Sequence, residues 1–68
     1  MLLKELVLNS LENLDTFKLQ YSYYKGEIKE LELTEKLYEQ LADKEIKHFY
    51  LDYDKTSNKP YISISMEN

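Results

Sequence analysis

The spacing of apolar residues switches along this chain from a helical period to a strand period, back to a helical period, and again to a strand period. Over residues 2–14 the apolar residues recur every three or four positions, which is typical of an amphipathic helix. From Phe17 to Tyr23 they alternate instead, as in a half-buried strand. These changes predict a mixture of helices and strands. The Leu/Val-rich run over residues 2–8 also fits a strand, and that alternative stays open.

The only glycine of the chain, Gly26, marks the first predicted hairpin. A three-residue hairpin loop needs a positive φ at its last position, which glycine adopts at little steric cost. This loop would set the register of strands 17–23 and 27–33, in which the apolar faces of both strands coincide. The predicted pairs are Tyr23 with Glu27, Tyr21 with Lys29, Leu19 with Leu31, Phe17 with Leu33 and, on the outer face, Lys18 with Glu32.

The second half of the chain repeats the order of helix and hairpin. Thr34 is a candidate N-cap for a second helix of about ten residues. Residues 46–53 alternate, with Phe49, Leu51 and Tyr53 on one side. The turn-forming run 55–60 follows, and residues 61–66 alternate again, which predicts a second hairpin.

Together these segments predict an α+β protein in the order αββαββ, with one four-stranded antiparallel sheet and two helices packed on one face. This arrangement would cover every apolar stripe and leave the opposite sheet face, here called the open face, without helices. A chain of 68 residues has too little apolar surface for two cores, so residues 1–68 are predicted to form a single domain. Since no cysteine is present, stability must come from packing or self-association.

Charge and composition narrow the function classes. A net charge of −4 favours a protein partner with a basic surface and disfavours direct binding to nucleic acid or to an anionic membrane. The chain also has no arginine, the usual bidentate ligand of phosphate and guanine. No glycine-rich phosphate-binding motif occurs, so no cofactor is predicted. The N-terminal residues lack the layout of a signal peptide, and a cytoplasmic location is expected.

Seven tyrosines make the open face the main candidate for function. Tyrosine supplies a large contact area for little rotamer entropy, and rings beside carboxylates suit a basic, partly apolar partner. The high strand propensity of tyrosine explains the same residues equally well, so both interpretations stay open. The residues predicted on the open face are Tyr24, Ile28, Ile46, His48, Tyr50 and Tyr61, interleaved with Gln20, Glu30, Glu32, Asp52, Ser63 and Ser65.

A second candidate surface is an acidic row on the second predicted helix. Glu35, Glu39 and Asp43 recur every four residues and so lie along one side of that helix. Like charges at this spacing destabilise a helix by about 0.2–0.5 kcal/mol per pair, so local stability does not require them. The row could face lysines or arginines of a partner or imitate phosphate spacing, although a solvated surface is the favoured interpretation.

Catalysis finds little support in the sequence. His48 is the only histidine, and a flat sheet face lacks the pocket and oxyanion donors that Ser63 or Ser65 would need as a nucleophile. Glu30 and Asp52 are a possible pair of carboxylates, but nothing in the sequence predicts burial that would raise the pKa of either. We therefore predict that the protein is not an enzyme.

One segment resembles the start of a calcium-binding loop. Its oxygen-bearing residues occupy alternate positions: Asp52, Asp54, Thr56 and Asn58. Ser57 and Ser63 stand where such a loop requires glycine and a bidentate glutamate, so no metal site is predicted.

The favoured function is that of a small acidic protein-binding module. A compact chain rich in Lys, Glu, Asn, Ile and Tyr and without Arg resembles, in composition, the short accessory proteins of phages or mobile elements in low-GC bacteria. That resemblance implies an inhibitor of a host protein, including the nucleic-acid-mimic type known among anti-restriction and anti-CRISPR proteins. The other open alternative is a homo-oligomeric structural or regulatory protein whose Tyr-rich sheet face pairs with itself.

Overall fold

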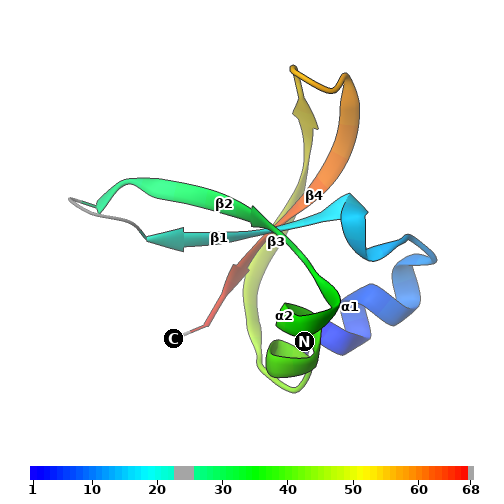
Figure 1. The fold of residues 1–68 in the computed structure, drawn as a ribbon. Coiled ribbons are helices and arrows are strands. Elements are labelled where there is room, and N and C mark those ends of the chain that lie inside the picture. The colour runs from blue at the N-terminus through cyan, green and yellow to red at the C-terminus, as the bar shows by residue number, and fades with distance from the viewer. Residues whose placement is uncertain (23–25, 68) are drawn as a thin grey trace.

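The computed structural model describes residues 1–22 and 26–67. Within this part of the chain, two helices and four strands follow the predicted order αββαββ, with a short 3₁₀ helix before the first strand (Figure 1). The elements are α1 (Leu3–Ser10), η1 (Leu14–Thr16), β1 (Phe17–Ser22), β2 (Ile28–Glu32), α2 (Glu35–Leu41), β3 (Ile46–Asp54) and β4 (Lys59–Met66). The four strands form one sheet, which confirms the α+β class.

Helix α1 settles the alternatives at the start of the chain, where residues 2–8 are mainly helical rather than extended. Its first turn is stabilised by Glu5, whose Oε1 accepts the Leu2 N–H at 2.9 Å. The next N–H groups of this turn donate to main-chain carbonyls in the turn that follows α2. The helix is shorter than the predicted 2–14, because Leu11 takes the left-handed conformation with a φ of 62° and ends it.

The first hairpin has the predicted register. Lys18 pairs with Glu32, Leu19 with Leu31 and Tyr21 with Lys29, and the Leu33 N–H donates to the Phe17 carbonyl at 3.0 Å. Gly26 has the predicted positive φ, 78°. The predicted pair of Tyr23 with Glu27 lies outside the described residues.

The second half begins with the predicted cap, since Thr34 Oγ1 accepts the Leu37 N–H at 3.2 Å at the start of α2. The hairpin of β3 and β4 follows, with one irregularity at Lys47, where the register shifts between Ile46 and His48. A bulge of this kind changes the face to which the preceding residue points. Ile46 is therefore buried in the core, and its predicted place on the open face is wrong.

The prediction of a wholly antiparallel sheet is also wrong. The strand order is β2-β1-β4-β3, and the central pair, β1 and β4, is parallel, while both hairpins are antiparallel. The two edge strands β2 and β3 therefore run in the same direction. Such a relation needs a crossover connection, which the segment containing α2 provides. Figure 1 shows the hairpins crossing at the β1–β4 pair, with the helices gathered at the lower right.

The core lies between the helices and one end of the sheet. Its buried apolar residues are Leu3, Leu6, Val7, Phe17, Leu19, Leu33, Ile46 and Ile64. The expectation that the helices cover every apolar stripe is wrong, because Phe49, Leu51 and Tyr53 of β3 are 46%, 74% and 50% exposed. Helices of 8 and 7 residues, at about 1.5 Å per residue, do not extend along a nine-residue strand.

Candidate binding surface on the open face

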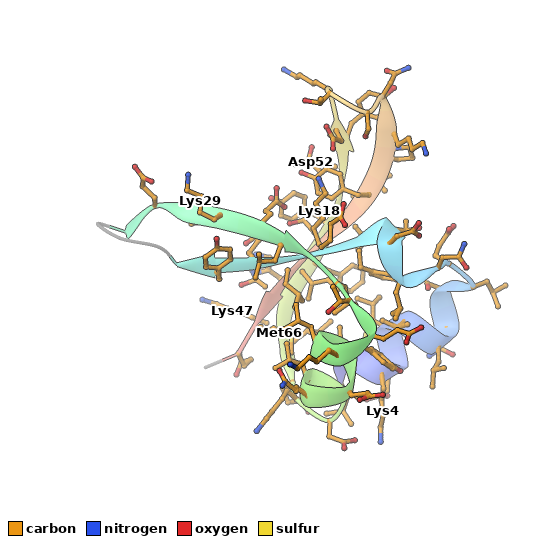
Figure 2. The ribbon with its side chains drawn as sticks, in the orientation of Figure 1. Lys4, Lys18, Lys29, Lys47, Asp52 and Met66 are labelled. Atoms are coloured by element: carbon orange, nitrogen blue, oxygen red, sulfur yellow. The ribbon has the colours of Figure 1, made fainter. Side chains whose placement is uncertain are left out.

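The open face is built from alternate residues of all four strands, on the side of the sheet away from α1 and α2. The predicted residues that the structure places there are Glu30, Glu32, His48, Tyr50, Asp52 and Tyr61. Tyr24 lies outside the described residues. Figure 2 shows Lys18 and Asp52 near the point where the two hairpins cross, while Lys4 lies at the helical end of the molecule.

Tyr61 lies on the open face but is not displayed as predicted. Its side chain is only 8% exposed, and Lys18 Nζ lies 4.2 Å from the centroid of its ring. The Tyr61 hydroxyl lies 2.9 Å from Glu30 Oε1 and 3.2 Å from Asp52 Oδ2. The predicted exposure of Tyr61 is wrong because side chains of the crossing hairpins, rather than a helix, cover the ring. Its burial, and then the neighbouring Glu30 and Asp52 carboxylates, raise the pKa of the phenol.

Ser63 and Gln20 connect this phenol to the remaining strands. Ser63 is fully buried, and its hydroxyl donates to Glu30 Oε2 at 2.6 Å and accepts from Gln20 Nε2 at 2.8 Å. The same Gln20 amide donates to the Tyr50 hydroxyl at 2.9 Å. One network of side chains thus joins β2, β4, β1 and β3, and it holds the Glu30 carboxylate in place.

Lys18 and Asp54 form an ion pair at 3.2 Å, with side chains 23% and 28% exposed. Asp54 also accepts the N–H groups of Thr56 and Ser57 at 2.9 and 3.3 Å. The Thr56 N–H, followed by Lys18 and the Ser57 N–H, lowers the pKa of Asp54 to about 2. The segment that resembles a calcium-binding loop is therefore the turn of the β3–β4 hairpin. Sequence reasoning missed this pair, because strand alternation suggested Glu32 as the neighbour of Lys18.

Three carboxylates of the open face have no ion-pair partner within the described part of the chain: Glu30, Glu32 and Asp52. Glu30 and Asp52 converge on the Tyr61 hydroxyl, whose single proton can be donated to only one of them at a time. Negative charges held this close together attract a cation. The arrangement can therefore receive a lysine or arginine side chain.

His48 and Tyr50 supply aromatic surface beside these acids. Their rings stack with centroids 6.4 Å apart and an interplanar angle of 19°. Both side chains are exposed, Tyr50 to 44%. An open hollow of about 830 Å³ adjoins His48, with Gln20, Ile28, Lys47 and Ser65 among the other residues that line it. Apolar contact area is thus available next to the negative charge.

The predicted acidic row on α2 is not continuous. Glu35 and Glu39 are exposed on α2, but this helix ends at Leu41, so Asp43 lies beyond it. Asp43 instead forms an ion pair with Lys4 at 2.7 Å, and this contact lowers the pKa of Asp43. The prediction that Asp43 extends the row is wrong because the helix is shorter than the apolar stripe suggested.

No family model, curated protein or solved structure matches this chain. Among residues 1–22 and 26–67, no three His, Cys, Asp or Glu side chains lie close enough together to hold a metal ion. No helix in the same residues has the length and apolar character needed to cross a membrane.

Proposed function

We propose that this protein is a small non-enzymatic binding module whose open face docks on a basic surface of a partner protein. The observation that carries the proposal is the convergence of Glu30 and Asp52 on the Tyr61 hydroxyl, with no lysine of the described chain in ion-pair contact with either carboxylate. A lysine or arginine side chain of the partner supplies the missing positive charge.

The two carboxylates are held in position before a partner arrives. Glu30 accepts the hydroxyl of Ser63 at 2.6 Å, and Asp52 Oδ1 accepts the Tyr53 N–H at 2.7 Å. A surface that is already ordered loses less conformational entropy on binding. Hydrogen bonds from lysine or arginine to a carboxylate are also about twice as strong as those between neutral groups.

His48 and Tyr50 form the apolar part of the proposed docking surface. The Tyr50 hydroxyl is oriented by Gln20, so its exposed ring has a defined position beside the acids. Tyrosine is enriched at the energetic centres of protein interfaces because it buries a large area and fixes few torsions. The combination favours a partner patch that carries both basic and apolar side chains.

We further propose that the chain acts as an accessory or inhibitor protein of a phage or mobile element, with the partner among the proteins of the host. Its composition, rich in Lys, Glu, Asn, Ile and Tyr and without Arg, supports this origin. The acidic balance supports a basic partner surface.

A nuclear magnetic resonance titration with a model basic ligand tests the docking surface. Isotope-labelled protein is titrated with a tetra-arginine peptide, and the amide shifts are mapped on the structure. Shifts concentrated in residues 28–32, 48–54 and 61–65 are expected. Shifts centred on α2, or spread evenly over the surface, would contradict the proposal.

Two matched variants sharpen this titration. Asp52→Asn removes one of the converging charges with little change in size and should weaken peptide binding. Glu12→Gln makes the same charge change at an exposed position after α1 and should leave the affinity unchanged. Equal loss of affinity in both variants would point to net charge alone rather than to the open face.

A further inference from the structure

The two edge strands of the sheet differ in how well they are protected. β2 has five residues, and three of them are charged: Lys29, Glu30 and Glu32. Charged residues on a short edge discourage the addition of another strand. β3 has nine residues, and residues 49–51 carry no charge. The charged residues of β3, Lys47, Asp52 and Asp54, lie on either side of this stretch, and an uncharged stretch of an edge strand is a template for pairing with a further strand.

The main-chain groups of Phe49 and Leu51 point toward this free edge. Tyr53 lies opposite Pro60 in the β3–β4 ladder. Because Pro60 has no N–H, the two residues cannot exchange a pair of main-chain hydrogen bonds, so they form a non-hydrogen-bonded pair. Paired residues alternate between hydrogen-bonded and non-hydrogen-bonded positions, so Phe49 and Leu51 are also in non-hydrogen-bonded pairs with β4. Consistently, the Tyr53 N–H donates at 2.7 Å to Asp52 Oδ1 instead of to a strand.

Only the middle of this edge is open. At its start the bulge at Lys47 interrupts the regular ladder, and bulges disfavour edge pairing. Toward its end the Asp52 carboxylate occupies the Tyr53 N–H. The groups that remain for a new strand are those of Phe49 and Leu51, whose side chains are 46% and 74% exposed.

We propose that a second copy of this chain pairs with the β3 edge, β3 against β3 and antiparallel, about a two-fold axis at Tyr50. In this register Phe49 of each copy lies opposite Leu51 of the other, and the two residues exchange their free main-chain hydrogen bonds. Their exposed side chains share the face that carries the helices and cover one another. Tyr50 faces Tyr50 on the open side of the sheet.

Charge complementarity supports this register. It sets His48 opposite Asp52 of the second copy, and the symmetry repeats the contact. A histidine ring N–H can donate to a carboxylate, and Asp52 keeps acceptor capacity beyond its bonds to Tyr53 and Tyr61. If the axis lay at Leu51 instead, Tyr53 would lie opposite Phe49 of the second copy. The Tyr53 N–H would then have to give up its hydrogen bond to the Asp52 carboxylate. The axis at Tyr50 leaves the existing contacts intact.

The pairing joins two sheets edge to edge and leaves both open faces uncovered. Its hydrogen bonds come from main-chain groups of β3, and Asp52 is the one docking carboxylate that it also contacts, through His48 of the second copy; Glu30 and the Tyr61 hydroxyl take no part in it. The dimer therefore does not depend on the proposed function, and its tests need no basic peptide.

A single introduced cysteine reports the register without ambiguity, because the chain has no cysteine of its own. Tyr50→Cys places two thiols at the axis in a non-hydrogen-bonded pair, with Cα atoms about 4.5 Å apart, which is within disulfide range. Leu8→Cys, at a 69% exposed position on α1, is the matched control. In a glutathione redox buffer, Tyr50→Cys should form a disulfide dimer at dilutions where Leu8→Cys stays monomeric. Equal cross-linking of the two variants would overturn the proposal.

Sedimentation equilibrium of the unchanged chain provides the second test. A reversible dimer is expected, and Leu51→Lys should raise its Kd at least about tenfold by placing a charge at the paired edge. Leu11→Lys, at a 95% exposed position, should leave the Kd unchanged, and circular dichroism checks that both variants are folded. A monomer at every concentration, or a dimer that survives Leu51→Lys, would overturn the proposal.

Discussion

Replacing Tyr61 with alanine is expected to remove most of the stability of this protein. The side chain is 8% exposed, and truncation of a buried aromatic residue costs about 3–5 kcal/mol. The total free energy of unfolding expected for 68 residues is about 3–10 kcal/mol. Tyr61→Ala should therefore be largely unfolded in mild urea, although Tyr61 lies on the sheet face that no helix covers.

Two further variants separate the ring from its hydroxyl. Tyr61→Phe keeps the ring and loses the hydrogen bond to the Glu30 carboxylate, which should cost about 1–2 kcal/mol because Glu30 retains the Ser63 hydroxyl. Tyr50→Ala is the matched control for ring removal at an exposed site. Its side chain is 44% exposed, so the expected cost is below about 1 kcal/mol.

Urea denaturation followed by far-ultraviolet circular dichroism measures the free energy of unfolding of all three variants. The expected order of destabilisation is Tyr61→Ala, then Tyr61→Phe, then Tyr50→Ala. If Tyr61→Ala costs as little as Tyr50→Ala, the Tyr61 ring is not buried between the hairpins. The contacts that position Glu30 and Asp52 would then be absent in solution.

Three further predictions concern ionisation and one turn. Since the pKa of Asp54 in the folded protein is about 2, below its ordinary 3.8, Asp54 contributes stability that is lost as the pH falls from about 4 to about 2. Urea midpoints across this range should depend less on pH in Asp54→Asn, and an unchanged dependence would refute the assignment. The raised pKa of Tyr61 contributes stability that is present below about pH 10 and lost above it, because the unfolded chain ionises this phenol first. An ultraviolet titration should show one phenolate step that coincides with unfolding and disappears in Tyr61→Phe, whereas ionisation of every phenol in the folded state would contradict this. Gly26→Ala should lower the free energy of unfolding by about 1 kcal/mol, because the φ of Gly26 is 78° and no other atom crowds the site. D-alanine at the same position, introduced by chemical synthesis, should lower it less. Equal stability of the two forms would refute a backbone cause.

Local patterns were sufficient to predict the hairpins and one helix start. The alternation around Gly26 admits only one register that keeps apolar residues on a common face, and β1 and β2 adopt it. Thr34 could be identified because a hydroxyl before a helical stripe satisfies a free N–H group of the first turn. Each of these features depends on residues close together in the chain.

The way in which the hairpins meet could not be predicted from the sequence. The alternation of apolar residues assigns a sheet face to each residue of β1 and β4. This pattern is the same whether the two strands run parallel or antiparallel, so it does not reveal their relative direction. The early end of α1 and the bulge at Lys47 were missed for a related reason. Leu11 takes its left-handed conformation without a glycine to signal it, and no glycine marks Lys47.

For the candidate surface too, local patterns could be predicted from the sequence and long-range contacts could not. Alternation correctly places Glu30, Asp52 and Tyr61 on the open face. The burial of Tyr61 and the pairing of Lys18 with Asp54 depend on how the two hairpins cross, and crossing follows from the central parallel pair. Contacts between residues distant in the sequence thus determined which side chains of the open face remain exposed.

Whether the open face attracts basic partners through its unpaired carboxylates is tested most directly by the salt dependence of tetra-arginine binding. Affinity measured by calorimetry should fall as the salt concentration rises, because added ions screen exposed charges. Asp52→Asn should lower both the affinity and its dependence on salt, while Glu39→Gln on α2 should change neither. An affinity that is insensitive to Asp52→Asn, or that falls equally in Glu39→Gln, would contradict docking at the open face.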